Sequence, residues 1–572
     1  MISVQSAVGK GQILAKKALN QIRRLIFAVR MSRFVRKFSW KKAALYTVLS
    51  LLISAYCFVL GGLTVLMPPM VSIGLATLPV PILIWATPEL RRVPLGLLRK
   101  LFFATVFVQM CIPIYYAVQI PGLPWLSVRR IVLLFMIILF SVSFAGSKEV
   151  RSYLYRTMSV NKYLFYCIFG YYTWCFLSIF TSANPSASMT QFVEFTLNWY
   201  LPLLACVLVI RTMDDVRRLL KAILIFAFIV TAVGVLDFIG EKNYAIYIMP
   251  KALVNALSAA NPSFAMIANT NPYREGVYRS GSRFSVALSY GEFAAIVAPI
   301  GGYFLFHART PFERWLGALT ILATLVNLFV SSARGGSVAF LASMPILLAL
   351  WVARVGRIDP KSMVGPLGAG LALLAITCLM GLVFTWGRLH KMVFGSGETA
   401  SSDAARFDQA HLAWPHILSN PITGHGIGMA GEVIGYFTPG GQPTVDSSVL
   451  MLAVETGVPG ISFFFCMLGI ASWLNMRIYL RDSHPDAAVG AALACSFIAY
   501  SIYRLVLSQR ENEGLLFVLV GLACVVVKLA ADRMKKQSPE SAKTVFSVIN
   551  RPFADSTRQP APAATTAGNT SR

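Results

Sequence analysis

Long apolar runs separated by short polar stretches occupy most of the chain between Leu45 and Leu529. A helix needs about 20 apolar residues to cross roughly 30 Å of hydrocarbon, because each residue advances it by about 1.5 Å. The pattern predicts an all-α polytopic membrane protein of about 14 transmembrane helices, or roughly 12 to 14 if the weakest runs do not span. The predicted spans are 44–67, 69–87, 101–119, 128–146, 163–181, 189–210, 220–240, 287–307, 315–332, 336–354, 363–386, 447–476, 486–503 and 512–531.

Lysine and arginine gather in alternate loops between these runs. They are dense in the loops at 91–100, 148–162 and 211–221, and absent from the loops at 67–69, 120–127 and 182–188. Cytoplasmic loops of membrane proteins retain the positive charge, so the first set is predicted inside and both termini are predicted cytoplasmic. Four arginines fall on the wrong side of this rule, namely Arg129, Arg130, Arg504 and Arg510.

The spans and loops divide the chain into seven predicted regions. A basic cytoplasmic tail covers 1–42, transmembrane helices 1–7 cover 43–240, and a periplasmic loop covers 241–286. Helices 8–11 cover 287–386, a large periplasmic loop covers 387–446, helices 12–14 cover 447–531, and a disordered cytoplasmic tail covers 532–572. The stretch Ala405–Leu418 alternates polar and apolar faces, which predicts a helical cap within the large loop.

Composition supports a membrane protein and excludes a nucleic-acid-binding one. The 572 residues are 56% hydrophobic and only 13% charged, about half the charge of a soluble domain. The net charge of +27 comes from the basic tail, which holds eleven Lys or Arg and no acid, and from short loops. The tail is interpreted as an amphipathic helix on anionic lipid or as a solvated topology anchor, and both stay open.

Arginine stands at three places where outward loops meet the membrane. These are Tyr278–Arg283, which contains Arg279 and Arg283, the tight turn Ser331–Gly336, which contains Arg334, and Arg406 in the large loop. Arginine near hydrocarbon is costly and usually has a partner, and its planar fork suits phosphate oxygens. A single such arginine could also reach lipid headgroups, but three on one face indicate an anion site.

The same segments resemble one family of membrane enzymes. Ser331-Ser332-Ala333-Arg334-Gly335 is similar to the S-x-x-R-G turn of the O-antigen ligase and polysaccharide polymerase family. Arg279 with Gly281, followed by Tyr290-Gly291-Glu292-Phe293, resembles that family's entry to a helix. Arg406 with Trp414, then Asn420–Gly428 and Val445–Leu450, resembles its periplasmic loop. The resemblance covers about residues 270–470 in the expected order.

The resemblance implies a glycosyltransferase that uses an undecaprenyl-diphosphate-linked glycan at the periplasmic face of the inner membrane, without metal or other cofactor. Arg279, Arg283, Arg334 and Arg406 are the predicted diphosphate-binding residues, and Arg279 and Arg334 are also predicted to act in catalysis. Asp446 is the preferred group to accept a proton or orient the acceptor, with Glu292, His416 and His425 as further candidates. Membrane lipids and a chain-length-regulating copolymerase are the expected partners.

One departure decides between the family's two activities. Family ligases commonly carry His-Asn where this chain has Asp446-Ser447. The departure favours a polymerase of exopolysaccharide or O-antigen repeats over a ligase that transfers polysaccharide to lipid A core. A membrane carrier for a lipid-linked or anionic solute is the alternative from another class, but its spans should carry ions near mid-bilayer.

Overall fold

The computed structural model describes residues 47, 48, 50–52, 54–56, 58, 93–118, 126–260, 262–269, 272–274, 276–359, 361, 363–385, 398–437 and 443–537. The chain divides into two units, residues 1–87 and 88–572. In the first unit the described residues are helical. The predicted basic tail and the span 69–87 lie outside the described residues, and the span 44–67 is described only in part.

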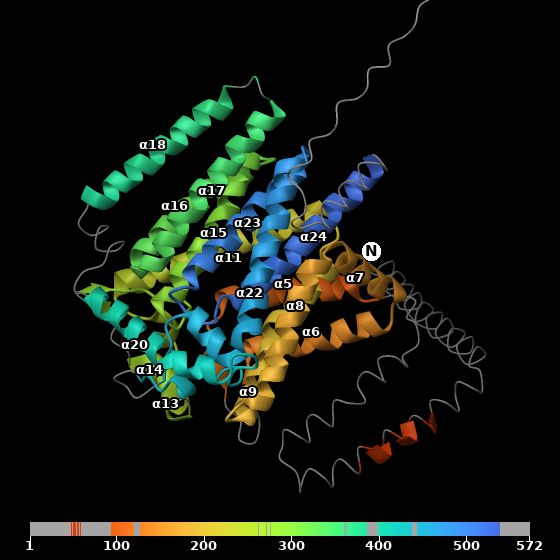
Figure 1. Cartoon of the computed structure of the whole chain (residues 1–572), viewed down its shortest axis with the longest axis vertical. Coiled ribbons are helices and arrows are strands. Elements are labelled where there is room, and N and C mark those ends of the chain that lie inside the picture. The colour runs from red at the N-terminus through yellow and green to blue at the C-terminus, as the bar shows by residue number, and fades with distance from the viewer. Residues whose placement is uncertain are drawn as a thin grey trace, which may run out of the picture. The chain divides into compact units, whose positions relative to one another are not determined.

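The second unit is built almost entirely of helices (Figure 1). They are α5 (Leu95–Cys111), α6 (Val128–Ala145), α7 (Lys148–Val160), α8 (Lys162–Leu177), η1 (Ser178–Thr181), α9 (Pro185–Phe195), η2 (Thr196–Tyr200), α10 (Leu201–Val209), α11 (Met213–Gly240), α12 (Tyr244–Tyr247), α13 (Lys251–Ala260), α14 (Pro262–Asn269), α15 (Ala287–His307), α16 (Pro311–Ser331), α17 (Arg334–Ile358), α18 (Val364–Thr385), α20 (Glu398–Ser419), α21 (Ala430–Ile434), α22 (Ser448–Arg481), η3 (Pro485–Ala488), α23 (Val489–Tyr503) and α24 (Glu513–Gln537). Two short hairpins accompany them, β1 (Ala117–Val118) with β2 (Leu126–Ser127) and β3 (Tyr273–Arg274) with β4 (Val277–Tyr278).

Ten helical segments among the described residues are long and apolar enough to cross a membrane. They correspond to the predicted spans from 128–146 to 512–531, with the exception of 363–386, where the structure has the 22-residue helix α18. The predicted span 101–119 coincides in part with α5, which has only 17 residues. The all-α polytopic class is therefore confirmed, whereas the number of 14 spans stays a prediction.

Helix α15 lies at the centre of the second unit, and every residue from 289 to 304 is buried. It packs against α16, α17 and α23, and glycines permit the close approach. A Cβ atom at Gly317 would lie 2.6 Å from the carbonyl oxygen of Gly301, and one at Gly336 would lie 2.8 Å from that of Gly291. Small residues of this kind let membrane helices pack backbone to backbone.

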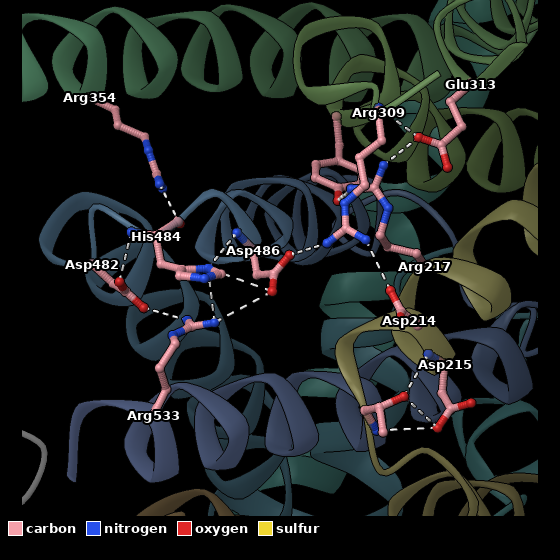
Figure 2. A network of polar contacts seen from close by, with 12 residues as sticks. Asp214, Asp215, Arg217, Arg309, Glu313, Arg354, Asp482, His484, Asp486 and Arg533 are labelled. Atoms are coloured by element: carbon pink, nitrogen blue, oxygen red, sulfur yellow. Dashed lines mark hydrogen bonds and ion pairs between the residues drawn. The ribbon is translucent and has the colours of Figure 1, made fainter. Parts of the chain in front are cut away.

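The polar loops of the second unit meet at the two ends of α15. At the end near His307, which we call the basic end, Arg309 pairs with Asp214 (3.0 Å) and Asp486 (2.7 Å), and Arg217 pairs with Glu313 (Figure 2). The loops predicted to be cytoplasmic contribute these residues. At the other end, which we call the loop end, Ser280 N–H donates to Val330 O (3.0 Å) and Ser448 N–H donates to Arg504 O (3.1 Å). The loop end holds the described parts of both long loops.

Candidate active site

The turns that carry Arg279 and Arg334 are joined at the loop end. Hairpin β3–β4 leads into Arg279, whose Nε donates to the carbonyl oxygen of Ser331 at 3.1 Å. Together with the bond from Ser280 N–H to Val330 O, this contact satisfies carbonyls at the C-terminus of α16 that have no partner within the helix. Arg334 follows three residues after Ser331 and begins α17. The structure therefore brings together two arginines that are 55 positions apart in the sequence.

The first turn of α17 has no side-chain cap. Its N-cap residue Ala333 makes no side-chain capping bond, so the leading N–H groups and the positive end of the helix dipole face the loop end. The neighbouring glycines have a packing role instead. A Cβ atom at Gly335 would lie 2.9 Å from Cγ2 of Val506, and Gly336 lies against Gly291.

A cavity of about 620 Å³ opens beside Arg279. Residues of the predicted periplasmic loop 241–286 line it, including Lys242, Tyr273, Tyr278 and Ser285. Its lining combines the cations Lys242 and Arg279, the carboxylate Glu241, tyrosines, and apolar residues at the start of α15. A space of this size and composition suits an anionic group attached to sugar or lipid.

Tyr503 links the predicted site residues. Its hydroxyl donates to Leu288 O at 2.7 Å, and its ring lies against Gly335. Glu292, Arg279, Arg504 and Arg406 all act on the Tyr503 hydroxyl electrostatically, so their charges lie within electrostatic range of it. No sequence pattern pointed to Tyr503, because a tyrosine near the end of an apolar run is common in membrane helices.

Asp446 and Arg406 face each other across the large loop. Asp446 lies just before α22, and its N–H donates to Oε1 of Gln409 at 2.8 Å. Gln409 is one helical turn after Arg406 on α20, which contains the predicted stretch Ala405–Leu418. Burial raises the pKa of Asp446, and the Arg406 guanidinium and Gln409 oppose that shift. The carboxylate is therefore more basic than that of an exposed aspartate.

Glu292 is not open to a substrate in this structure. It is fully buried and pairs with the equally buried Arg504, whose Nε lies 3.1 Å from Oε1. Asn512 Nδ2 also donates to Glu292 Oε2 at 2.8 Å. Although burial acts in the opposite direction, the carboxylates of Glu292 and Glu513 raise the pKa of Arg504. These contacts give Glu292 a structural position.

Arg510, which is partly buried, makes a similar ion pair with the buried Glu455 of α22. Arg504 and Arg510 are thus two of the four arginines that break the positive-inside pattern. Their predicted placement outside is compensated because each has a carboxylate partner in the protein. In the sequence, both residues stood out as exceptions to the positive-inside rule.

His416 and His425 lie together at another part of the large loop. The Nε2 atom of His425 is 2.9 Å from the carbonyl oxygen of His416. The His425 N–H donates to Val454 O (2.8 Å), and Gly426 N–H donates to Glu455 O (3.0 Å). Their described contacts fix the loop against α22 beside its kink at Gly457, where φ is +65°. These contacts indicate a structural role.

Arg283 points away from the Arg279 turn. It is 4% exposed, lies 3.9 Å from the centre of the Phe284 ring, and interacts with Arg129 and Glu511. Burial and the nearby Arg129 lower its pKa to about 9, against the opposing effect of Glu511. Among the described residues, no group of three or more His, Cys, Asp or Glu side chains could hold a metal ion.

Comparison with known families gives one match. Residues 318–465 match the family model described as O-antigen ligase, which supports a relation of this chain to ligase- and polymerase-type membrane enzymes. The predicted resemblance is confirmed. The matched segment contains Arg334, Arg406 and Asp446, whereas Arg279 and Glu292 precede it. A search of curated proteins gave no match.

Proposed function

We propose that this multi-pass membrane protein polymerises undecaprenyl-diphosphate-linked oligosaccharide repeat units, of an exopolysaccharide or an O-antigen, at the periplasmic face of the inner membrane. The observation that carries the proposal is the joining of the Arg279 and Arg334 turns beside a cavity at the loop end. The domain match supports a reaction of this type. Asp446-Ser447, in place of His-Asn, favours polymerase over ligase.

The reaction is a substitution at the anomeric carbon of the lipid-linked glycan. A hydroxyl oxygen of the acceptor repeat forms a bond to this carbon while the bond from carbon to diphosphate oxygen breaks. The electron pair leaves with the diphosphate, and the hydroxyl proton passes to a base. The protein must therefore stabilise negative charge on the leaving diphosphate and accept one proton.

Arg279 and Arg334 are assigned to the leaving diphosphate. Guanidinium groups stay charged at any working pH and bind phosphate oxygens in pairs. The N-terminus of α17 adds N–H groups and a positive dipole end at the same place. Charge that develops on the diphosphate is thus stabilised by groups already held in position, and no metal is assigned a role.

Asp446 is assigned to the acceptor hydroxyl. Its carboxylate lies at the junction of the large loop and α22 with a raised pKa, which suits a proton acceptor. Arg406 is assigned to orient Asp446 and to contact the diphosphate or sugar.

The test is the glycan profile of cells that lack the protein and are complemented with variants. Arg334→Ala and Arg279→Ala are compared with wild type and with Arg357→Ala, which alters the other end of the same helix α17. A polymerase predicts single repeats on lipid and no ladder for both active-site variants, at normal protein levels, and a normal ladder for Arg357→Ala.

Other outcomes identify the alternatives. Long chains that persist on undecaprenyl diphosphate but never reach lipid A core would identify a ligase. Wild-type ladders in both active-site variants would contradict the arginine mechanism and favour a carrier.

A further inference from the structure

A second cavity lies at the loop end next to the Arg279 cavity. Its volume is about 320 Å³, and Ile267 of α14 lines both cavities. Polar groups of several elements line it, among them Arg129 and Arg130 at the start of α6, Glu194 of α9 and Asn198 of η2. Arg129 and Arg130 are the other two arginines that break the positive-inside pattern. We call this space the Arg129 cavity.

The guanidinium groups around the Arg129 cavity outnumber the carboxylates. Arg130 pairs with Glu194. Arg129 and Arg283 both interact electrostatically with the carboxylate of Glu511. Glu511 also accepts a hydrogen bond from the Ser285 N–H at 3.1 Å. Among the described residues, the lining of the cavity itself thus holds two guanidiniums, those of Arg129 and Arg130, and one carboxylate, that of Glu194.

Arg129 is the group with unused binding capacity. Its Nε and Nη2 atoms are buried and have no hydrogen-bond partner among the described residues. A buried cation without full compensation is unfavourable, and an anion bound beside Arg129 would remove that cost. By contrast, the buried Arg504 and the partly buried Arg510 have ion-pair partners in the protein.

An apolar groove continues from the Arg129 cavity. Its volume is about 420 Å³, and it shares Ala117 with that cavity. Val128 and Ile131 of α6 form part of its wall, opposite Met249 and Leu253. Farther along α6 the exposed side chains are also apolar, namely Leu134, Phe135 and Ile138. A hydrocarbon chain in the groove would therefore continue along a face of α6 that suits lipid contact.

We propose that the Arg129 cavity and this groove form a second site for a prenyl diphosphate, with the diphosphate in the cavity and the isoprenoid chain in the groove. The inference rests on the proposed function, because a polymerase must hold two lipid-linked molecules, the growing chain and the next repeat. The Arg279 cavity takes one of them and the Arg129 cavity takes the other. A phospholipid has related headgroup chemistry, so the test must separate the two lipids.

The experiment counts undecaprenyl diphosphate molecules bound to the purified full-length protein in detergent by native mass spectrometry. Wild type should bind two. Arg334→Ala and Arg129→Gln should each bind one at the same concentration, with affinity at the altered site weakened roughly tenfold or more. Arg156→Ala, at an exposed arginine on α7, should still bind two.

A second variant guards against misfolding of Arg129→Gln. Val128 is 42% exposed at the first position of α6 and lines the groove, so the Val128→Asp variant should fold. The new carboxylate should disfavour binding of both the isoprenoid chain and the diphosphate. This variant should also bind one molecule. Phosphatidylglycerol at equal concentration should not displace the second prenyl diphosphate.

Two results would overturn the inference, namely two molecules on both Arg129→Gln and Val128→Asp, or displacement of the second molecule by phosphatidylglycerol. The proposed function is judged separately by the glycan ladder of Arg334→Ala and Arg279→Ala. If native mass spectrometry confirms the second site but Arg334→Ala and Arg279→Ala still make a normal ladder, the polymerase mechanism alone would be refuted. If Arg334→Ala and Arg279→Ala lose the ladder but the purified wild-type protein binds only one prenyl diphosphate, this inference alone would be refuted.

Discussion

The two ends of the α15 bundle use arginine in different ways. At the basic end, Arg309 bridges Asp214 and Asp486, Arg533 pairs with Asp482, and Arg354 donates to His484 O at 2.7 Å (Figure 2). At the loop end, Arg279 and Arg129 line cavities. Arginine therefore joins loops together at one end, whereas at the other end two arginines line the cavities to which we assign anionic ligands.

The loop end itself contains both kinds of arginine. Arg504 and Arg510 are held by Glu292, Glu513 and Glu455 and stabilise the junctions among α15, α22 and α24. Arg279 lines a cavity next to the C-terminus of α16, and Arg334 begins α17. Substitutions in the first pair should therefore reduce stability, and substitutions in the second pair should reduce activity at normal stability.

The largest effect on rate is expected for Asp446→Asn. Loss of the group that accepts the acceptor proton should slow elongation of lipid-linked repeats by roughly 100- to 10,000-fold. Asp408→Asn, on the exposed face of α20, is the matched control and should retain the wild-type rate. An Asp446→Asn elongation rate within a factor of about three of the wild-type rate would show that Asp446 is not the proton acceptor.

The pH profile sharpens the same prediction. Because burial raises the pKa of Asp446, the carboxyl becomes protonated at a higher pH than an exposed aspartate does. Wild-type elongation should therefore decline as pH falls through that raised pKa, and residual Asp446→Asn activity should lack the decline. If the elongation rates of wild type and Asp446→Asn fell identically at low pH, the loss of activity would belong to another titrating group.

The largest effect on stability is expected for Arg504→Ala. The change leaves Glu292 buried without its cation and should lower the free energy of unfolding by about 3–5 kcal/mol. Unfolding in mixed micelles, followed by loss of helical circular dichroism, measures this difference. A wild-type unfolding profile would show that the pair is not part of the stable core.

A smaller loss is expected for Gly457→Ala in the kink of α22. Gly457 has φ of +65°, and a Cβ atom there would lie 2.5 Å from Ile422 O. Strain of roughly 1–3 kcal/mol should appear in the free energy of unfolding. Gly469→Ala on the same helix is the control, since no atom lies within 4 Å of its Cβ position. Equal stability of the two variants would contradict the role given to the kink.

The smallest effect is expected at the basic end. Arg309 is about half exposed, and Arg309→Ala should change the free energy of unfolding by at most about 1 kcal/mol, less at high salt. The same unfolding assay provides the comparison with Arg504→Ala. If Arg309→Ala and Arg504→Ala lowered the free energy of unfolding equally, the distinction between the basic end and the loop end would be wrong.

The sequence predicted the helical membrane class and the helix in the large loop because length, hydropathy and alternation determine them locally. It also identified the family, since Ser331–Gly336 and Asn420–Gly428 are continuous motifs. Three-dimensional pairings were harder to predict. Glu292 looked available as a base, yet the structure pairs it with Arg504, 212 positions away. Arg283 and Arg279 are neighbours in the chain, but Arg279 lines a cavity whereas Arg283 is buried against the Phe284 ring.

The most direct test of the central claim uses purified protein in liposomes with a lipid-linked repeat and follows elongation over time. The proposed roles predict that Arg334→Ala and Arg279→Ala each lose roughly 100-fold or more of the rate, while Arg357→Ala and the wild-type protein elongate equally. Wild-type elongation by both active-site variants would contradict the assignment of these arginines to the leaving diphosphate.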